Sequence, residues 1–126
     1  WNEVEHVKES GMNETEYVSQ ALSKVRRFAK ATGVHVWLVA HPQKLYREDG
    51  KIPVPSMYDI SGSANFANKA DFGIVVHRPD ETSVTDIHVK KVRHKFLGSV
   101  GVVRLRYSSA TGEYFDDLEV MEDEQS

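Results

Sequence analysis

The sequence predicts an α/β fold in which buried, mostly parallel strands are flanked by helices and followed by antiparallel strands. Three patterns support this prediction. An amphipathic stripe at helical spacing runs through residues 14–32, a run at 34–40 is apolar except for His35, and residues 84–93 alternate between apolar and polar. The run follows the helical stripe after the single Gly33, which is the spacing of a helix-to-strand turn in an α/β unit. The alternation is typical of an antiparallel strand with one solvated face.

The composition is that of one globular domain. The 126 residues are 40% hydrophobic and 28% charged, and we expect a domain over residues 1–115 followed by an acidic, disordered tail at 116–126. No apolar run approaches the length of a transmembrane helix and no signal peptide opens the chain, so no membrane partner is expected. The absence of cysteine excludes disulfides and thiolate metal sites, and the six histidines lack the spacing of metal ligands.

Charge is segregated along the chain. The net charge of −3 comes from the tail, because residues 1–115 carry 16 basic and 13 acidic side chains. Between Ile87 and Gly112 there is no acidic residue, whereas six residues there are basic: Lys90, Lys91, Arg93, Lys95, Arg104 and Arg106. This stretch is either a solvated strand face or a surface for an anionic partner.

The helix at 14–32 is defined by local signals at both ends. Asn13 is followed three residues later by Glu16, which is the pattern of a capping box. The apolar stripe consists of Val18, Leu22, Val25 and Ala29. Gly33 is expected to end the helix.

The run at 34–40 is predicted to be a strand buried on both faces, as in parallel sheets. His41 follows it directly, at the carboxyl end where open α/β sheets bind ligands. Residues 42–58 contain three prolines and show no periodicity, so they are predicted to form a long loop.

The rest of the chain is predicted to contain one short helix and four strands. Small residues at 59–71 lead into the helix, which Ser61 or Ser63 could cap. Residues 72–77 form a second strand of the buried type, which ends in His77 and Arg78. The antiparallel strands are expected at 84–93, 102–107 and 113–115.

Three motifs, in this order, resemble a known family. They are Gly33-Val34…Val39-Ala40-His41, Asp59-Ile60-x-Gly62-Ser63-Ala64-x5-Ala70-Asp71, and Lys95-Phe96-x-Gly98-x-x-Gly101. Together they resemble the C-terminal half of the RecA-like motor, a P-loop NTPase core, of hexameric replicative DNA helicases. This family includes the bacterial DnaB type, mitochondrial Twinkle and the phage primase-helicases. The phage and Twinkle branches are more similar, since His41 stands where DnaB types have Gln.

The resemblance implies an ATP-dependent DNA helicase that unwinds in the 5′–3′ direction as a ring of six identical subunits. It implies ATP, Mg²⁺ and single-stranded DNA as ligands of the full-length protein. The location would be the cytoplasm of a bacterial or phage-infected cell, or the mitochondrial matrix for the Twinkle branch. No G-x-x-x-x-G-K-[ST] phosphate loop is present, and the chain opens on Trp1. We therefore expect a fragment cut just after the magnesium-holding aspartate, without bound cofactor and inactive by itself.

The resemblance also implies roles for individual residues near the nucleotide. His41 would be the sensor that links the γ-phosphate to the DNA-binding loops, because imidazole can bind a phosphate oxygen and change partners after hydrolysis. Arg93 and Lys95 match a basic pair that relatives project into the neighbouring subunit's nucleotide site as an arginine finger. Relatives have Lys-x-Arg in the opposite order, so either residue could be the finger. Arg78 and Tyr107 fall where relatives contact the nucleotide base, although plain structural roles are the alternative for both.

The loop at 44–58 and the segment at 59–68 resemble the central-channel loops that hold single-stranded DNA. The residues implied in this binding are Lys44, Lys51, Ser61, Gly62, Ser63 and Lys69. Small residues allow backbone amides to approach phosphates closely, as a sequence-independent clamp requires. Ser61 and Ala67 replace arginines of phage members, so lysines would supply the charge.

Two other functions fit parts of the sequence. The basic strands at 88–106 could follow a phosphate backbone in a nucleic-acid-binding module without enzymatic activity. The chain could also derive from another RecA-like ATPase, such as a recombinase or a clock-type ATPase. A sensor-like His41 at the end of a buried strand favours the helicase, because a binding module has no need for it.

Overall fold

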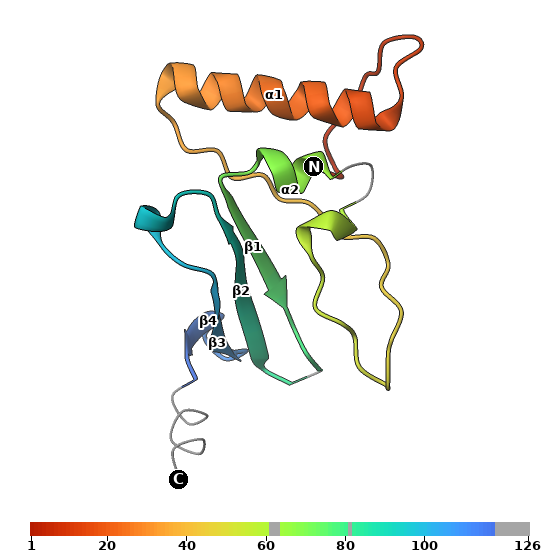
Figure 1. Cartoon of the computed structure of the whole chain (residues 1–126). Coiled ribbons are helices and arrows are strands. Elements are labelled where there is room, and N and C mark those ends of the chain that lie inside the picture. Colours follow the sequence, from red (N-terminus) through yellow and green to blue (C-terminus); the bar gives the residue numbers. More distant parts are fainter. Residues whose placement is uncertain (61–63, 81, 118–126) are drawn as a thin grey trace. The chain divides into compact units, whose positions relative to one another are not determined.

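The computed structural model describes residues 1–60, 64–80 and 82–117, which divide into two compact units. The first unit consists of residues 1–44 and 56–71. The second consists of residues 45–55 and the chain from residue 72 onward. Figure 1 shows the helices of the first unit and the sheet of the second.

The first unit is built on helix α1 (Glu14–Thr32), whose limits match the predicted 14–32. The Asn13 side chain accepts a hydrogen bond from the Glu16 backbone at 2.8 Å, and the Glu16 carboxylate accepts one from the Asn13 backbone at 3.4 Å. Gly33 adopts the left-handed conformation with φ of 72°, and its N–H donates to the Ala29 carbonyl at 2.9 Å. The predicted capping box and glycine end are therefore confirmed.

A small apolar core joins α1 to the short helix α2 (Asn65–Lys69). Val18 and Leu22 of α1 are buried against Phe66 of α2. The Trp1 ring packs edge-on against Phe66 with 5.3 Å between centroids. The stripe predicted from helical spacing thus faces the core of this unit.

Arg26 fixes the carboxyl end of α2 against α1. Its Nη1 donates to the Lys69 carbonyl at 3.2 Å, and its Nη2 lies 3.6 Å from the Asp71 carboxylate. A cation beside the last carbonyls of a helix satisfies groups that have no partner within the helix and interacts favourably with the helix dipole. Ser61 and Ser63, predicted as caps of this helix, lie outside the described residues.

The strand predicted at 34–40 is not present. These residues belong to no helix or strand, and their apolar side chains are exposed, with Trp37 73% and Val39 72% accessible. A strand buried on both faces requires paired neighbours at its edges and layers above and below it. None of the described residues supplies these, so the apolar pattern alone does not produce the strand.

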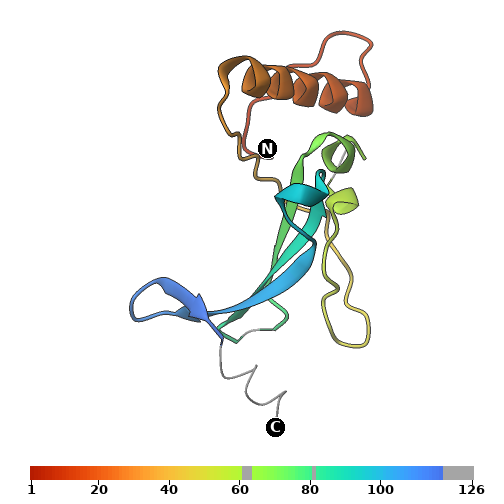
Figure 2. The same ribbon diagram turned by 60° about the vertical axis from the view of Figure 1, so that its left-hand side comes forward.

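The second unit is a four-stranded sheet in the order β1-β2-β3-β4. Its strands are β1 (Phe72–His77), β2 (Val84–Val92), β3 (Gly101–Ser108) and β4 (Glu113–Asp116). All three neighbouring pairs are antiparallel (Figure 2). This confirms the predicted antiparallel C-terminal strands. A parallel core is not shown: β1, expected as a strand of the buried type, pairs antiparallel with β2.

The loop predicted at 42–58 contains local structure at three points. Pro42 forms an isolated antiparallel bridge with Ile60. Glu48 and Lys51 form an isolated antiparallel bridge around Asp49 and Gly50, whose φ angles are 51° and 76°. Positive φ at both central residues is the geometry of a type I′ turn, for which Asp-Gly is a preferred pair. A single 3₁₀ turn follows at Met57–Asp59.

The predicted tail at 116–126 starts too early. Asp116 is the last residue of β4, and the Asp117 side chain is 1% exposed and pairs with Arg106. Residues 118–126, to which the prediction of disorder mainly applies, lie outside the described residues.

Candidate functional site

The predicted functional residues are divided between the two units. His41, Lys44 and Lys69 belong to the first unit. The second unit contains Lys51, Arg78, Arg93, Lys95 and Tyr107. Ser61, Gly62 and Ser63 lie outside the described residues.

His41 is exposed and directly follows the segment 34–40. Its backbone N–H donates to the Asn2 side-chain oxygen at 2.7 Å, and the Trp1 amine donates to the Val39 carbonyl. These two bonds hold the first residues of the chain beside the end of the segment. They fix the backbone at His41 and leave the imidazole accessible to a ligand.

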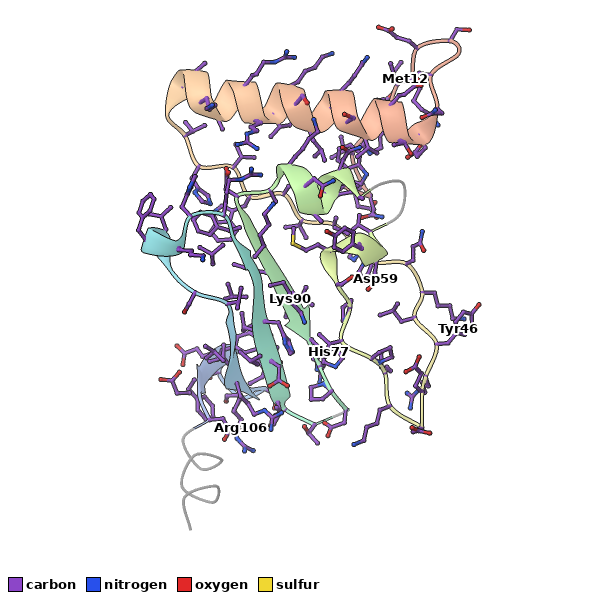
Figure 3. All side chains as sticks on the ribbon, viewed as in Figure 1. Met12, Tyr46, Asp59, His77, Lys90 and Arg106 are labelled. Carbon is purple, nitrogen blue, oxygen red and sulfur yellow. The ribbon has the colours of Figure 1, made fainter. Side chains whose placement is uncertain are left out.

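The three predicted DNA-binding lysines differ in their surroundings. Lys44 and Lys51 are exposed, and Lys51 follows the Asp49-Gly50 turn. Tyr46, 80% exposed, lies on the same loop (Figure 3). Lys69 instead donates from Nζ to the Ser23 hydroxyl of α1 at 2.5 Å. The Lys69 ammonium therefore stabilises the helix pair in this structure.

Arg78 and Tyr107, both predicted to contact a nucleotide base, are linked at one end of the sheet. Arg78 Nη2 donates to the Thr82 carbonyl at 3.1 Å. The Tyr107 backbone N–H donates to the carbonyl of the next residue, Ser83, at 2.8 Å. The turn between β1 and β2 thus connects two residues that are far apart in the sequence.

Two further side chains shape this end of the sheet. Tyr114 of β4 lies directly opposite Tyr107 of β3, with 5.0 Å between the ring centroids. Asp80 accepts a hydrogen bond from the Thr82 backbone at 2.9 Å. The hydrogen bonds from Thr82 lower the pKa of Asp80, and the nearby Arg104 and Arg78 charges contribute in the same direction.

Arg93 and Lys95 lie in the connection between β2 and β3. Lys95 begins a 3₁₀ turn (Lys95–Leu97) and is exposed, whereas Arg93 is partly buried at the end of β2. Between them, His94 stacks on Phe96 at 5.5 Å, and the Phe96 ring is 84% exposed. Lys95 on its exposed turn is therefore able to reach a separate molecule, whereas Arg93 is less accessible.

A row of charged side chains crosses the sheet. Asp86 of β2 lies opposite both His77 and Arg104, and it accepts two hydrogen bonds from Arg104, at 2.7 and 3.1 Å. Arg106 donates to the buried Asp117 at 3.0 Å. In Figure 3, the labelled residues His77, Lys90 and Arg106 mark strands β1, β2 and β3, respectively. Arg104 and Arg106, two cations of the acid-free stretch, are therefore held by carboxylates of the described residues.

Two histidines, His77 and His88, lie next to this row of charges. His77 is 7% exposed, and its ring lies 6.2 Å from that of His88. The His88 Nε2 is buried and has no hydrogen-bond partner among the described residues. Burial lowers the pKa of His88, as do the Lys90 and His77 charges, while Asp86 raises it.

The sequence analysis missed Asp86, Asp117 and Tyr114. The sequence did contain one indication of the Asp86–Arg104 pair, because the two residues lie in strands that were predicted to be neighbours. Their contact depends on the register between the strands, which alternation alone does not define. Tyr114 could have been found in the same way, as the partner of Tyr107 across the last hairpin.

Among residues 1–60, 64–80 and 82–117, no group of three or more His, Asp or Glu side chains is placed to hold a metal ion. Within the same residues, no helix combines the length and the hydropathy that crossing a bilayer needs.

The fold and the sites define an α/β chain with an antiparallel sheet, whose predicted base-contacting residues lie at one end of that sheet. No family model matches it. The chain is 47% identical over 121 residues to the Twinkle homolog protein, chloroplastic/mitochondrial, of Arabidopsis thaliana. The match covers 92% of this chain and 17% of that protein, so the chain spans about a sixth of its relative's length. The chain is therefore homologous to one segment of a Twinkle-type protein.

Proposed function

We propose that this chain is part of the motor of an ATP-dependent replicative DNA helicase of the Twinkle type. The observation that supports this most is the 47% identity to a Twinkle homolog over nearly the whole chain. The three sequence motifs point to the same family independently of that comparison. The relative's name also makes mitochondria or chloroplasts the proposed location, in preference to the bacterial or phage-infected cytoplasm.

In this proposal, each accessible residue acts on one part of the nucleotide. Arg78 and Tyr107 contact the base, and their link through the β1–β2 turn supports a shared task. Arg93 or Lys95 reaches the neighbouring subunit and stabilises the charge that develops as the γ-phosphoryl group is transferred. His41 binds a phosphate oxygen and reports hydrolysis to the DNA-binding loops.

The described residues do not account for the whole reaction. No described cluster of carboxylates and imidazoles fits Mg²⁺, and the sequence has no phosphate loop. In the proposal both are supplied by other parts of the full-length protein. The exposed apolar segment 34–40 supports this, because neighbouring strands outside the chain would bury Trp37 and Val39 in a sheet.

A nucleic-acid-binding module without ATPase activity is the second candidate. Its supporting feature is the acid-free basic stretch of β2 and β3. However, Arg104 and Arg106 bind Asp86 and Asp117, and these carboxylates reduce the positive charge available to phosphates. The helicase is therefore the better supported function.

ATP hydrolysis and unwinding by the full-length protein test the proposal. We expect single-stranded DNA to stimulate hydrolysis, and a forked duplex with a 5′ tail to be unwound. His41→Ala should abolish both activities. His35→Ala is the matched control, since His35 is an exposed histidine on the same segment that packs on Trp37. DNA binding without any hydrolysis would favour the binding module.

A further inference from the structure

The Asn2 side chain supplies the hydrogen-bond acceptor for the backbone at His41. Its oxygen accepts from the His41 N–H at 2.7 Å, although the two residues are 39 positions apart in the sequence. Only the oxygen of the Asn amide can accept a hydrogen bond, so this contact defines which way the amide points. The backbone carbonyl that precedes Asn2, that of Trp1, is already used by the Val4 N–H at 3.1 Å and by His6 Nε2 at 3.0 Å. The His41 N–H is therefore satisfied by a side chain.

The turn that presents Asn2 is anchored to helix α1. Because the Trp1 carbonyl can only accept, His6 Nε2 carries the proton, and Nδ1 of the neutral ring accepts from the Tyr17 hydroxyl of α1 at 2.6 Å. The rings of Trp1 and His6 also pack together, with 4.2 Å between their centroids. These contacts connect the turn to a helix of 19 residues, so Asn2 is presented to His41 from a rigid element.

The bond from Asn2 fixes the backbone of His41 and leaves its side chain accessible. His41 is exposed, and the segment 34–40 that leads to it belongs to no helix or strand. The Trp1 nitrogen donates to the Val39 carbonyl, so two bonds to the first residues of the chain hold the end of this segment. A displacement of about 1 Å can cost roughly a hundredfold in rate when a side chain must meet a phosphate in one geometry. The bond from Asn2 is thus placed to affect what the imidazole does.

We infer that Asn2 is a positioning residue for His41, which it holds where the imidazole can follow the state of the γ-phosphate. This inference rests on the proposed function, in which His41 links the γ-phosphate to the DNA-binding loops. In this role Asn2 acts through His41 and contacts neither the nucleotide nor the DNA. Removing the Asn2 acceptor should therefore weaken the coupling between the bound nucleotide and DNA affinity.

The test uses the full-length protein and measures its affinity for a single-stranded oligothymidylate, once with a non-hydrolysable ATP analogue and once with ADP. The ratio of the two dissociation constants measures the coupling between nucleotide and DNA. Asn2→Leu removes the acceptor at similar size, and Asn2→Asp keeps an acceptor oxygen. Glu5→Leu is the matched control, because Glu5 is an exposed residue of the same opening segment. Thermal melting checks that all three variants remain folded.

We expect Asn2→Leu to lose most of a ratio that is typically about 5- to 150-fold for coupled sites, while Asn2→Asp and Glu5→Leu keep it. Because Asn2 acts through His41, Asn2→Leu should cause no further loss in a His41→Ala background. A residue with a merely structural role would lower the ratio in both backgrounds.

Four results would overturn the inference. They are an unchanged ratio in Asn2→Leu, an equal loss in Asn2→Asp, an equal loss in Glu5→Leu, and a further loss when Asn2→Leu is added to His41→Ala.

The failure of this inference and the failure of the proposed function can be told apart. If the parent protein shows no DNA-stimulated ATP hydrolysis, or if its ratio is one, the helicase proposal or the sensor role of His41 fails whatever Asn2 does. If the parent protein is coupled and His41→Ala removes the coupling while Asn2→Leu keeps it, only the positioning role of Asn2 is wrong.

Discussion

Arg104 and Asp86 face each other across β2 and β3 and are joined by two hydrogen bonds, from Nε at 2.7 Å and from Nη2 at 3.1 Å. The Asp86 side chain is 10% exposed and that of Arg104 42% exposed, so the carboxylate is much the more buried partner. The pKa of Asp86 is lowered chiefly by the hydrogen bonds from Arg104. This pair connects the two central strands of the sheet.

Asp86→Ala should loosen the centre of the sheet. Removing the carboxylate leaves the guanidinium without these two charge-assisted bonds, a loss of about 2 kcal/mol for a partly buried pair. Hydrogen exchange of the β2 and β3 amides in the full-length protein measures this locally. Asp80→Ala is the control, because the hydrogen bond that Asp80 accepts among the described residues comes from Thr82 of its own turn. Unchanged protection in Asp86→Ala would show that the pair contributes no stability.

The stability of the sheet should decrease in mildly acidic solution through His88. Its pKa is lowered in the folded protein, mainly by burial, so folding favours the neutral ring. This contribution is complete above the ordinary pKa of about 6.5 and is lost as the pH falls through the lower folded value. Lys90, Asp86 and His77 are the charged or titratable groups that face it.

Hydrogen exchange of β2 between pH 7 and pH 5 tests this dependence, after correction for the intrinsic exchange rate. We expect protection to decrease toward pH 5 in the parent protein and the decrease to be smaller in His88→Gln. A separate loss at lower pH belongs to Asp86, whose lowered pKa stabilises the folded state above about 4. An identical profile in His88→Gln would exclude His88 as the titrating group.

Lys51 and Lys69 should respond differently to neutralisation. Lys51 is exposed, so Lys51→Gln should weaken single-stranded DNA binding and reduce the salt dependence of log K by about 0.7 per lost phosphate contact. Lys69 is bonded to Ser23, so Lys69→Gln should mainly destabilise the packing of α1 and α2. Ser23→Ala should reproduce the Lys69→Gln effect on stability. A reduced salt slope in Lys69→Gln but not in Lys51→Gln would reverse this assignment.

The basic pair at the β2–β3 connection should act between subunits. In the full-length protein we expect Arg93→Ala and Lys95→Ala to lower DNA-stimulated hydrolysis, by about 10³- to 10⁵-fold for whichever is the finger. Mixing either variant with a protein whose phosphate loop is disabled should restore part of the activity, since a mixed ring pairs an intact loop with an intact finger. His94→Ala is the control between them. Absence of rescue at every mixing ratio would exclude action in trans.

Elements defined by neighbouring residues could be predicted from the sequence. Helix α1 was predicted with its correct limits because Asn13, Glu16 and Gly33 act within one turn of its ends. Strand β1 was also predicted at 72–77, and β2 differs from its predicted range only at residue 93. The alternation of apolar and polar residues that predicts a strand likewise lies within the strand itself, so it can be read from neighbouring residues.

Properties that depend on distant partners could not be predicted. The segment 34–40 has the composition of a buried strand, yet burial requires neighbours that the described residues do not provide. The pairing of Asp86 with Arg104 depends on strand register, which a shift of one residue would abolish. At the candidate site, the sequence named Arg78 and Tyr107, but their link through the β1–β2 turn and the place of Tyr114 opposite Tyr107 come from the folded strands.

The sequential order of the strands has a consequence for how the sheet forms. Every strand of the sheet pairs with the strand that follows or precedes it in the chain. Val84 and Arg106, the paired residues of β2 and β3 that lie farthest apart in the sequence, are still joined through the single β2–β3 connection. Closing such short loops costs little entropy, and single hairpins form in roughly 1–10 μs. A ribosome adds only about 5–20 residues each second. We therefore expect each hairpin to close as soon as its second strand leaves the ribosome, so that synthesis sets the pace at which the sheet is assembled.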